Sequence, residues 1–189
     1  MELEEALATR RSIRRYRRDD VSRDTLERVF NLALMGPSGW GLQKSRFVIV
    51  QGEQRRRLQD LCVDALPEVR TVLEEALPDR PDEVDVLMEF YRTYGNAPVL
   101  VVVYAGLLPD GDFDDIGAAL SVQNLFLAAH AAGLGTVWTS IMRIREAEIN
   151  TLLGVGTDQR IACITPLGYP DEQPSAAQRT PGRLTWIGF

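Results

Sequence analysis

The segment Thr9-Arg10-Arg11-Ser12-Ile13-Arg14-Arg15-Tyr16 places four arginines and a serine within its last seven residues. Arginine suits phosphate recognition because its planar guanidinium group donates two parallel, charge-assisted hydrogen bonds. Each such bond contributes roughly 1.5–3 kcal/mol. The chain carries a formal net charge of -6 at pH 7, so this basic segment stands out against an acidic background. Taken alone, it fits either a phosphate site or a solvated run of charge, which is the commoner case.

Composition narrows the class of protein. The chain has 189 residues, of which 45% are hydrophobic, enough for one compact domain with its own core. A pI near 4.9 disfavours a nucleic-acid binder with a broad basic face. Cys62 and Cys163 lie in apolar runs without zinc-ligand spacing, so we expect no metal site. Without a signal peptide or an apolar run of about 20 residues, we expect a cytoplasmic protein and no membrane partner.

Apolar periodicity and turn residues predict alternating helices and strands around one sheet, in an α+β or α/β arrangement. The predicted helices are residues 2–8, 22–34, 53–66, 114–132 and 145–153. The predicted strands are 47–50, 99–104 and 160–167, and residues 136–140 are predicted to form a short strand or a strand-like loop. The strand at 99–104 is apolar or aromatic throughout, which is typical of a central strand covered on both faces. Residues 68–94 read as short helices broken at Pro67 and at Pro78–Pro81, either structural or a cap over a site.

The helix predicted at 114–132 is apolar over most of its circumference, so we expect it to be buried, in part at a subunit interface. His130, the only histidine, is predicted to be a core or interface residue rather than a catalytic one. Asp112, Asp114 and Asp115 are predicted to form a solvated helix start. The apolar end of the tail, residues 186–189, is expected to pack against this subunit or a second one.

Several catalytic signatures are missing from the sequence. It contains no Gly-x-Ser-x-Gly elbow, no Walker loop and no Gly-x-Gly-x-x-Gly fingerprint. No pair of acids has an informative spacing. A chain with an anion-binding segment and no acid–base machinery is best explained by a bound cofactor that carries the reaction.

Four spaced motifs resemble the nitroreductase-like, FMN-dependent flavoproteins along nearly the whole chain. They are Arg10–Tyr16, Pro37–Gln43 followed by a strand, Asp115–Ser140, and Leu167–Asp171 with Arg179 downstream. Each is weak alone, but their order and spacing together are specific. The sequence departs from the family pattern at Gly41, where an asparagine is frequent, and at Lys44-Ser45, where Pro-Trp is frequent.

The resemblance implies one FMN-binding domain over residues 1–189, with a mostly antiparallel sheet between helical layers. It also implies an intertwined homodimer with FMN at the interface. Arg10, Arg11 and Ser12 would hold the phosphate with help from Arg14 and Arg179. Pro37, Ser38, Gly39 and Gln43 would reach the flavin from the partner, and Val137, Trp138, Thr139 and Ser140 would line its ring. From the residues alone, the Pro37–Gly39 segment also fits an ordinary turn and Trp138 a core residue.

The same resemblance implies an activity. NAD(P)H would donate hydride to FMN, and the reduced flavin would pass it to a nitroaromatic, a quinone or a similar electron-poor ring by a ping-pong mechanism. The alternative is an FMN-dependent dehydrogenase or tailoring enzyme acting on one pathway intermediate. A third reading, an arginine-rich arm binding nucleic acid or an acidic partner, is disfavoured by the net charge of -6.

Overall fold

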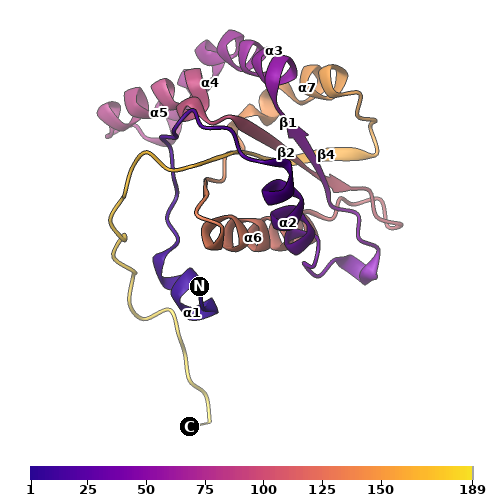
Figure 1. The fold of residues 1–189 in the computed structure, drawn as a ribbon, viewed down its shortest axis with the longest axis vertical. Helices are drawn as coiled ribbons and strands as arrows, with labels where there is room; N and C mark the ends of the chain where they lie inside the picture. Colours follow the sequence, from indigo (N-terminus) through magenta and orange to yellow (C-terminus); the bar gives the residue numbers. More distant parts are fainter. Residues whose placement is uncertain (189) are drawn as a thin grey trace.

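The computed structural model describes residues 1–188 and shows a sheet between two helical layers (Figure 1). The strands are β1 (Arg46–Val50), β2 (Val99–Gly106), β3 (Gly135–Thr136) and β4 (Gln159–Gly168). They form one sheet in the order β1-β2-β4-β3, and each neighbouring pair is antiparallel. The predicted α+β class is therefore confirmed.

Strand β2 forms the centre of the sheet, and all eight of its residues are buried. Because side chains alternate along a strand, its residues divide between two cores. Leu100, Val102 and Tyr104 join one core, whereas Val99, Val101 and Val103 join the other. The unbroken apolar run correctly predicted a strand covered on both faces.

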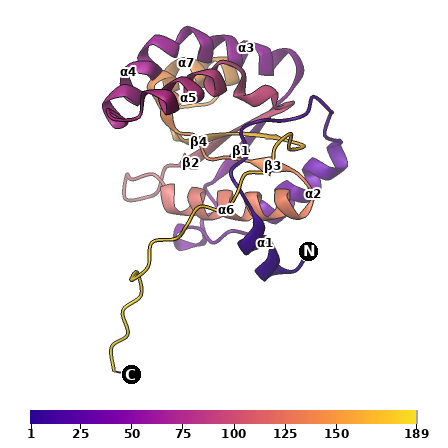
Figure 2. The same ribbon diagram turned by 90° about the vertical axis from the view of Figure 1, so that its left-hand side faces the viewer.

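One face of the sheet is covered by α3 (Gly52–Asp64), α4 (Leu66–Ala76), α5 (Pro81–Thr93) and α7 (Glu146–Leu153), as Figure 2 shows. The prediction of short helices separated near Pro67 and Pro78–Pro81 is confirmed, since α3 ends at Asp64, α4 begins at Leu66 and α5 begins at Pro81. Pro67 lies in the first turn of α4, where its missing N–H costs nothing. Both α4 and α5 contribute core residues, among them Val69, Val84 and Phe90, so this segment is part of the layer.

The opposite face is covered by α2 (Arg23–Ala33) and α6 (Asp115–Ala131), with α1 (Leu3–Thr9) beside α6 (Figure 1). Ser22 caps α2 by accepting a hydrogen bond from Thr25 N–H, as its position predicted. In the single chain, α6 is buried only on the side that faces the sheet and α2. Ile116 is 77% exposed and Leu120 is 41% exposed, so α6 presents an apolar strip to solvent in the single chain.

The basic segment forms an arm, residues 10–17, that joins three distant parts of the fold. Ile13 N–H donates to Thr136 O at 3.0 Å, and Tyr16 N–H donates to Gly95 O at 2.9 Å. Arg17 N–H donates to Tyr169 O at 2.9 Å. The Tyr16 side chain is buried, and its hydroxyl donates to Ile13 O at 2.5 Å. The backbone of the arm is thus fixed while most of its arginine side chains remain outside the core.

The tail leaves the body of the molecule after residue 174 as an extended segment (Figures 1 and 2). Trp186 and Ile187 are 72% and 86% exposed, so these two residues are not buried within this subunit, and packing against a second subunit stays a prediction. Phe189, which the same expectation included, lies outside the described residues. Within residues 1–188, no helix is both long and apolar enough to span a membrane, and no three His, Cys, Asp or Glu side chains gather as metal ligands.

Candidate functional site

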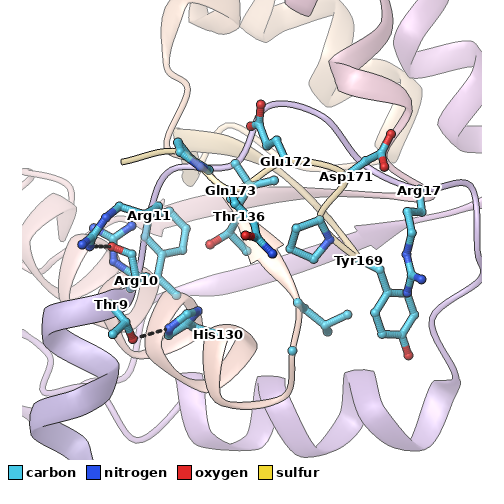
Figure 3. Close-up of a pocket in the computed structure, with 16 residues that line it drawn as sticks. Thr9, Arg10, Arg11, Arg17, His130, Thr136, Tyr169, Asp171, Glu172 and Gln173 are labelled. Carbon is cyan, nitrogen blue, oxygen red and sulfur yellow. Dashed lines mark hydrogen bonds between the residues drawn. The ribbon is translucent and has the colours of Figure 1, made fainter. Parts of the chain in front are cut away.

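A cavity of about 680 Å³ lies where the arm meets the C-terminal end of α6 and the segment that follows β4 (Figure 3). This volume is within the range of small-molecule and cofactor pockets. Arg10 and Arg11 line it from the arm, and Phe126 and His130 line it from α6. The remaining wall comes from Thr9, Ile13 and Arg17, from Gly133, Leu134 and Thr136, and from residues 169–174.

Two arginines predicted to hold a phosphate lie together at this cavity. Arg10 is half-buried and lies over the Phe126 ring, with 5.7 Å between its guanidinium carbon and the ring centroid. The pKa of Arg10 is lowered, first by burial and then by the charges of Arg11 and Arg179. Within residues 1–188, no ion pair joins Arg10 or Arg11 to a carboxylate. Crowded cations that form no ion pair fit an anionic ligand such as a terminal phosphate.

Arg11 is held by the end of α1. Its Nη1 donates to Ala8 O at 2.8 Å and to Arg10 O at 2.7 Å. A guanidinium group has five N–H donors, so these contacts leave donors for a ligand. Arg179 belongs to the extended tail and is exposed, but it is near enough to Arg10 to influence its charge state.

Ser12 and Arg14 lie beside a second cavity, of about 630 Å³, that is also lined by α5. Glu172 and Pro174 line both cavities, so the two adjoin at this point. Glu172 accepts hydrogen bonds from the backbone N–H groups of Arg14 and Arg15. The structure thus places Arg10 and Arg11 in the first cavity, and Ser12 and Arg14 in the second.

Residues 137–140 follow β3 directly, beside the arm. Val137 is buried in the core, and Trp138 is 41% exposed. Thr139 is buried and donates its hydroxyl hydrogen bond to Ile164 O at 2.5 Å, which fixes the segment against β4. Ser140 is exposed at the start of the short 3-10 helix Ile141–Arg145. Since β3 ends at Thr136 and Thr139 forms an isolated bridge to Ile164, residues 137–140 form the strand-like loop that was one of the two predictions.

The other predicted flavin contacts lie at the opposite end of α6. Pro37, Ser38 and Gly39 line a small cavity with residues near the N-terminus of α6, whereas the arginine cavity adjoins its C-terminal end. A helix of 17 residues spans roughly 25 Å at about 1.5 Å per residue. One chain therefore does not bring its Pro37–Gln43 loop to its own arginine cavity.

Asp114 was predicted to be solvated, and this was wrong: it is 4% exposed. It caps α6 by accepting a hydrogen bond from Gly117 N–H, and it also accepts one from Gly39 N–H. An acid ahead of an apolar helix was a sequence signal for such a cap. Its contact with a loop 75 residues away had no local signal.

His130 does not lie in the core, and its predicted place at a subunit interface stays a prediction. It is half-buried at the cavity wall, where its Nε2 lies 2.8 Å from Thr9 Oγ1. The pKa of His130 is lowered, first by burial and then by Arg10 and Arg11. The helical periodicity of the sequence indicated the apolar side of α6 for His130. The arm and α1 reach the C-terminal end of α6 only through tertiary packing, which that periodicity does not predict.

The sequence matches the Nitroreductase family over residues 7–169. The chain belongs to this family. Its relatives include the putative NAD(P)H nitroreductase YfhC of Bacillus subtilis, 29% identical over 96% of this chain and 91% of that protein. Another is the iodotyrosine deiodinase of Thermotoga neapolitana, 29% identical over 86% of each chain.

A solved structure with the same fold is NfnB, an FMN- and NADPH-dependent nitroreductase from Sphigopyxis sp. strain HMH. It superposes with a TM-score of 0.81 at 24% identity, covering 100% of both chains. The predicted family and its three-layer α+β fold are confirmed.

Proposed function

We propose that this chain is an FMN-dependent NAD(P)H oxidoreductase that works as a homodimer, with one FMN-binding domain over residues 1–189. The acceptor is a nitroaromatic, a quinone or a similar electron-poor ring, reduced by a ping-pong mechanism. The free thiols of Cys62 and Cys163 suit a reducing compartment such as the cytosol. The observation that carries the proposal is the arginine cavity, where Arg10 and Arg11 meet and, among residues 1–188, neither forms an ion pair with a carboxylate.

Arg10 and Arg11 would bind the terminal phosphate of FMN, and Arg179 would add charge from the tail. Bound FMN supplies the hydride chemistry at its ring nitrogen N5. The chain fixes the place of the ring through residues 137–140, which the Thr139–Ile164 hydrogen bond holds rigid. Trp138, left partly open, offers an aromatic surface beside that place.

The site is complete only when two chains meet. The Pro37–Gln43 loop lies at one end of α6 and the arginine cavity at the other. Between them α6 exposes Ile116 and Leu120, and α2 and the turn after it expose Leu32 and Met35. A second copy packed antiparallel on this apolar face would bring its own loop to the first chain's cavity.

The test is FMN binding followed by turnover. Purified chain incubated with FMN and then desalted should retain a flavin absorption band. NADH or NADPH should bleach this band without oxygen, and a nitroaromatic or quinone should restore it. A protein that is colourless after desalting would overturn the proposal.

A second candidate is an FMN-dependent enzyme with one dedicated substrate. The observation that favours it is the match to proteins named iodotyrosine deiodinase, from Thermotoga neapolitana and from Hydra vulgaris. The second cavity, between the arm and α5, offers room for substrate-specific contacts. Bound flavin that neither nicotinamide reduces, but that turns over a halogenated phenol with a chemical reductant, would select this candidate.

A further inference from the structure

His130 lies in the arginine cavity without a role in the proposed site. Its ring borders the cavity beside Arg10 and Arg11 (Figure 3). The ring of Phe126, one helical turn earlier on α6, contacts the Arg10 guanidinium group. His130 is the only basic residue in the last turn of α6. The C-terminal end of a helix carries partial negative charge, so it favours a cation at this position.

The hydrogen bonds of Thr9 define which nitrogen of His130 carries the proton. Thr9 Oγ1 lies 2.6 Å from Glu5 O, a carbonyl that can only accept, so the single hydroxyl proton is donated there. Thr9 Oγ1 must then accept from His130 Nε2 at 2.8 Å. In the neutral ring Nδ1 is consequently unprotonated and available to take a proton.

Charged groups around His130 make its charge depend on the ligand. Arg10 and Arg11 on the arm disfavour a charged ring, and Glu5 on α1 favours it to a lesser degree. Arg17, Asp171 and Glu172 line the rest of the cavity, and residues 123–131 of α6 carry no other charged side chain. A phosphate dianion added to this group would reverse the balance set by the two arginines.

We propose that His130 is a third cationic group for the FMN phosphate, which takes up a proton at Nδ1 when FMN binds and releases it when FMN leaves. The inference rests on the proposed function. It makes FMN retention sensitive to pH: the cofactor is held more tightly on the acidic side of neutrality and more weakly as pH rises.

The experiment compares the wild-type chain with His130→Gln, which keeps a donor for Thr9 but does not titrate. FMN affinity is measured from pH 6.5 to 8.5, and proton uptake is measured by calorimetry in two buffers of different ionisation enthalpy. Riboflavin, which lacks the phosphate, is the matched ligand control. The ionisation of the FMN phosphate itself contributes to the pH profiles of both proteins. Subtracting the His130→Gln profile from the wild-type profile therefore leaves the contribution of His130.

The expected result is that wild-type affinity for FMN falls roughly tenfold across this range, as expected for the loss of one charge-assisted hydrogen bond. His130→Gln should show a flatter profile and less proton uptake, and riboflavin should show no difference between the two proteins. Equal pH profiles for FMN in both proteins, or an equal effect on riboflavin, would overturn the inference alone. Absence of FMN binding at every pH would overturn the proposed function and the inference with it.

Discussion

Asp114 joins the predicted flavin loop to the helix that separates it from the arginine cavity. One carboxylate oxygen accepts from Gly39 N–H at 3.1 Å, and the other accepts from Gly117 N–H at 2.9 Å. The loop needs this support because Trp40 and Gln43 both have positive φ angles, of 51° and 52°, which are costly for residues other than glycine. Asp114 therefore fixes both the start of α6 and the place of the loop.

Removing that support should weaken folding and cofactor binding together. Asp114→Ala leaves two N–H groups without an acceptor and should lower the free energy of unfolding by about 1–3 kcal/mol. Asp114→Asn keeps an acceptor for one of them and should cost less. Urea titration and FMN affinity measure the two effects, and an unchanged stability in Asp114→Ala would contradict this role.

Gly95 should be intolerant of a side chain because it touches the arm. A Cβ atom there would lie 2.0 Å from Arg14 O, and its φ is +62°. Gly111 is the matched control, with a φ of +91° and open space around it. We expect Gly111→Ala to cost about 1–2 kcal/mol from the backbone alone, and Gly95→Ala to cost about 1–3 kcal/mol more.

The comparison is made by thermal or urea unfolding of the two variants. Gly95→Ala should also release FMN, since it displaces the arm. Similar stabilities for both variants would show that the arm moves freely at this point.

Glu172 should position the arm rather than touch the chemistry. It accepts from the N–H groups of Arg14 and Arg15 and pairs with the Arg15 side chain. Glu172→Ala should weaken FMN binding by roughly tenfold, whereas Arg15→Gln, which removes only the exposed ion pair, should have little effect. Equal losses in the two variants would assign the effect to the ion pair instead.

Mixed dimers test whether the site is shared. A chain with Arg10→Gln and Arg11→Gln lacks phosphate ligands, and a chain with Gln43→Leu lacks the predicted polar contact from the loop. A dimer of one chain of each kind has one intact site and one doubly altered site. It should bind one flavin with wild-type affinity, a result that neither parent dimer gives. Weak binding at both sites of the mixed dimer would place each loop in its own chain's site.

The buried thiol of Cys62 should make stability fall in alkaline solution. Burial raises the pKa of Cys62 from 9.0 to about 12, while its weak contact with the Tyr94 hydroxyl acts in the opposite direction. Between these values the unfolded chain loses a proton that the folded chain retains, so the free energy of unfolding decreases as pH rises from 9 to 12. Cys62→Ala should show a shallower decrease in urea titrations across this range.

Much of the fold could be predicted because local patterns agree with the tertiary structure. The apolar run at 99–104 became β2, and the helical period at 114–132 became α6. Ser22, as a capping residue, correctly predicted the start of α2. In each case, residues that are neighbours in the sequence carry the pattern that predicts the element.

The errors concern contacts between distant residues. The burial of Asp114 depends on Gly39, and the place of His130 depends on Thr9. No periodicity encodes such pairs, because they arise only when the helices pack.

The central claim is that Arg10 and Arg11 hold the phosphate end of FMN, and equilibrium binding of FMN and riboflavin tests it most directly. The wild-type chain should bind FMN far more tightly than riboflavin, and the chain with Arg10→Gln and Arg11→Gln should lose most of this preference. If the double variant keeps the wild-type preference for FMN, the phosphate lies elsewhere and the claim is contradicted.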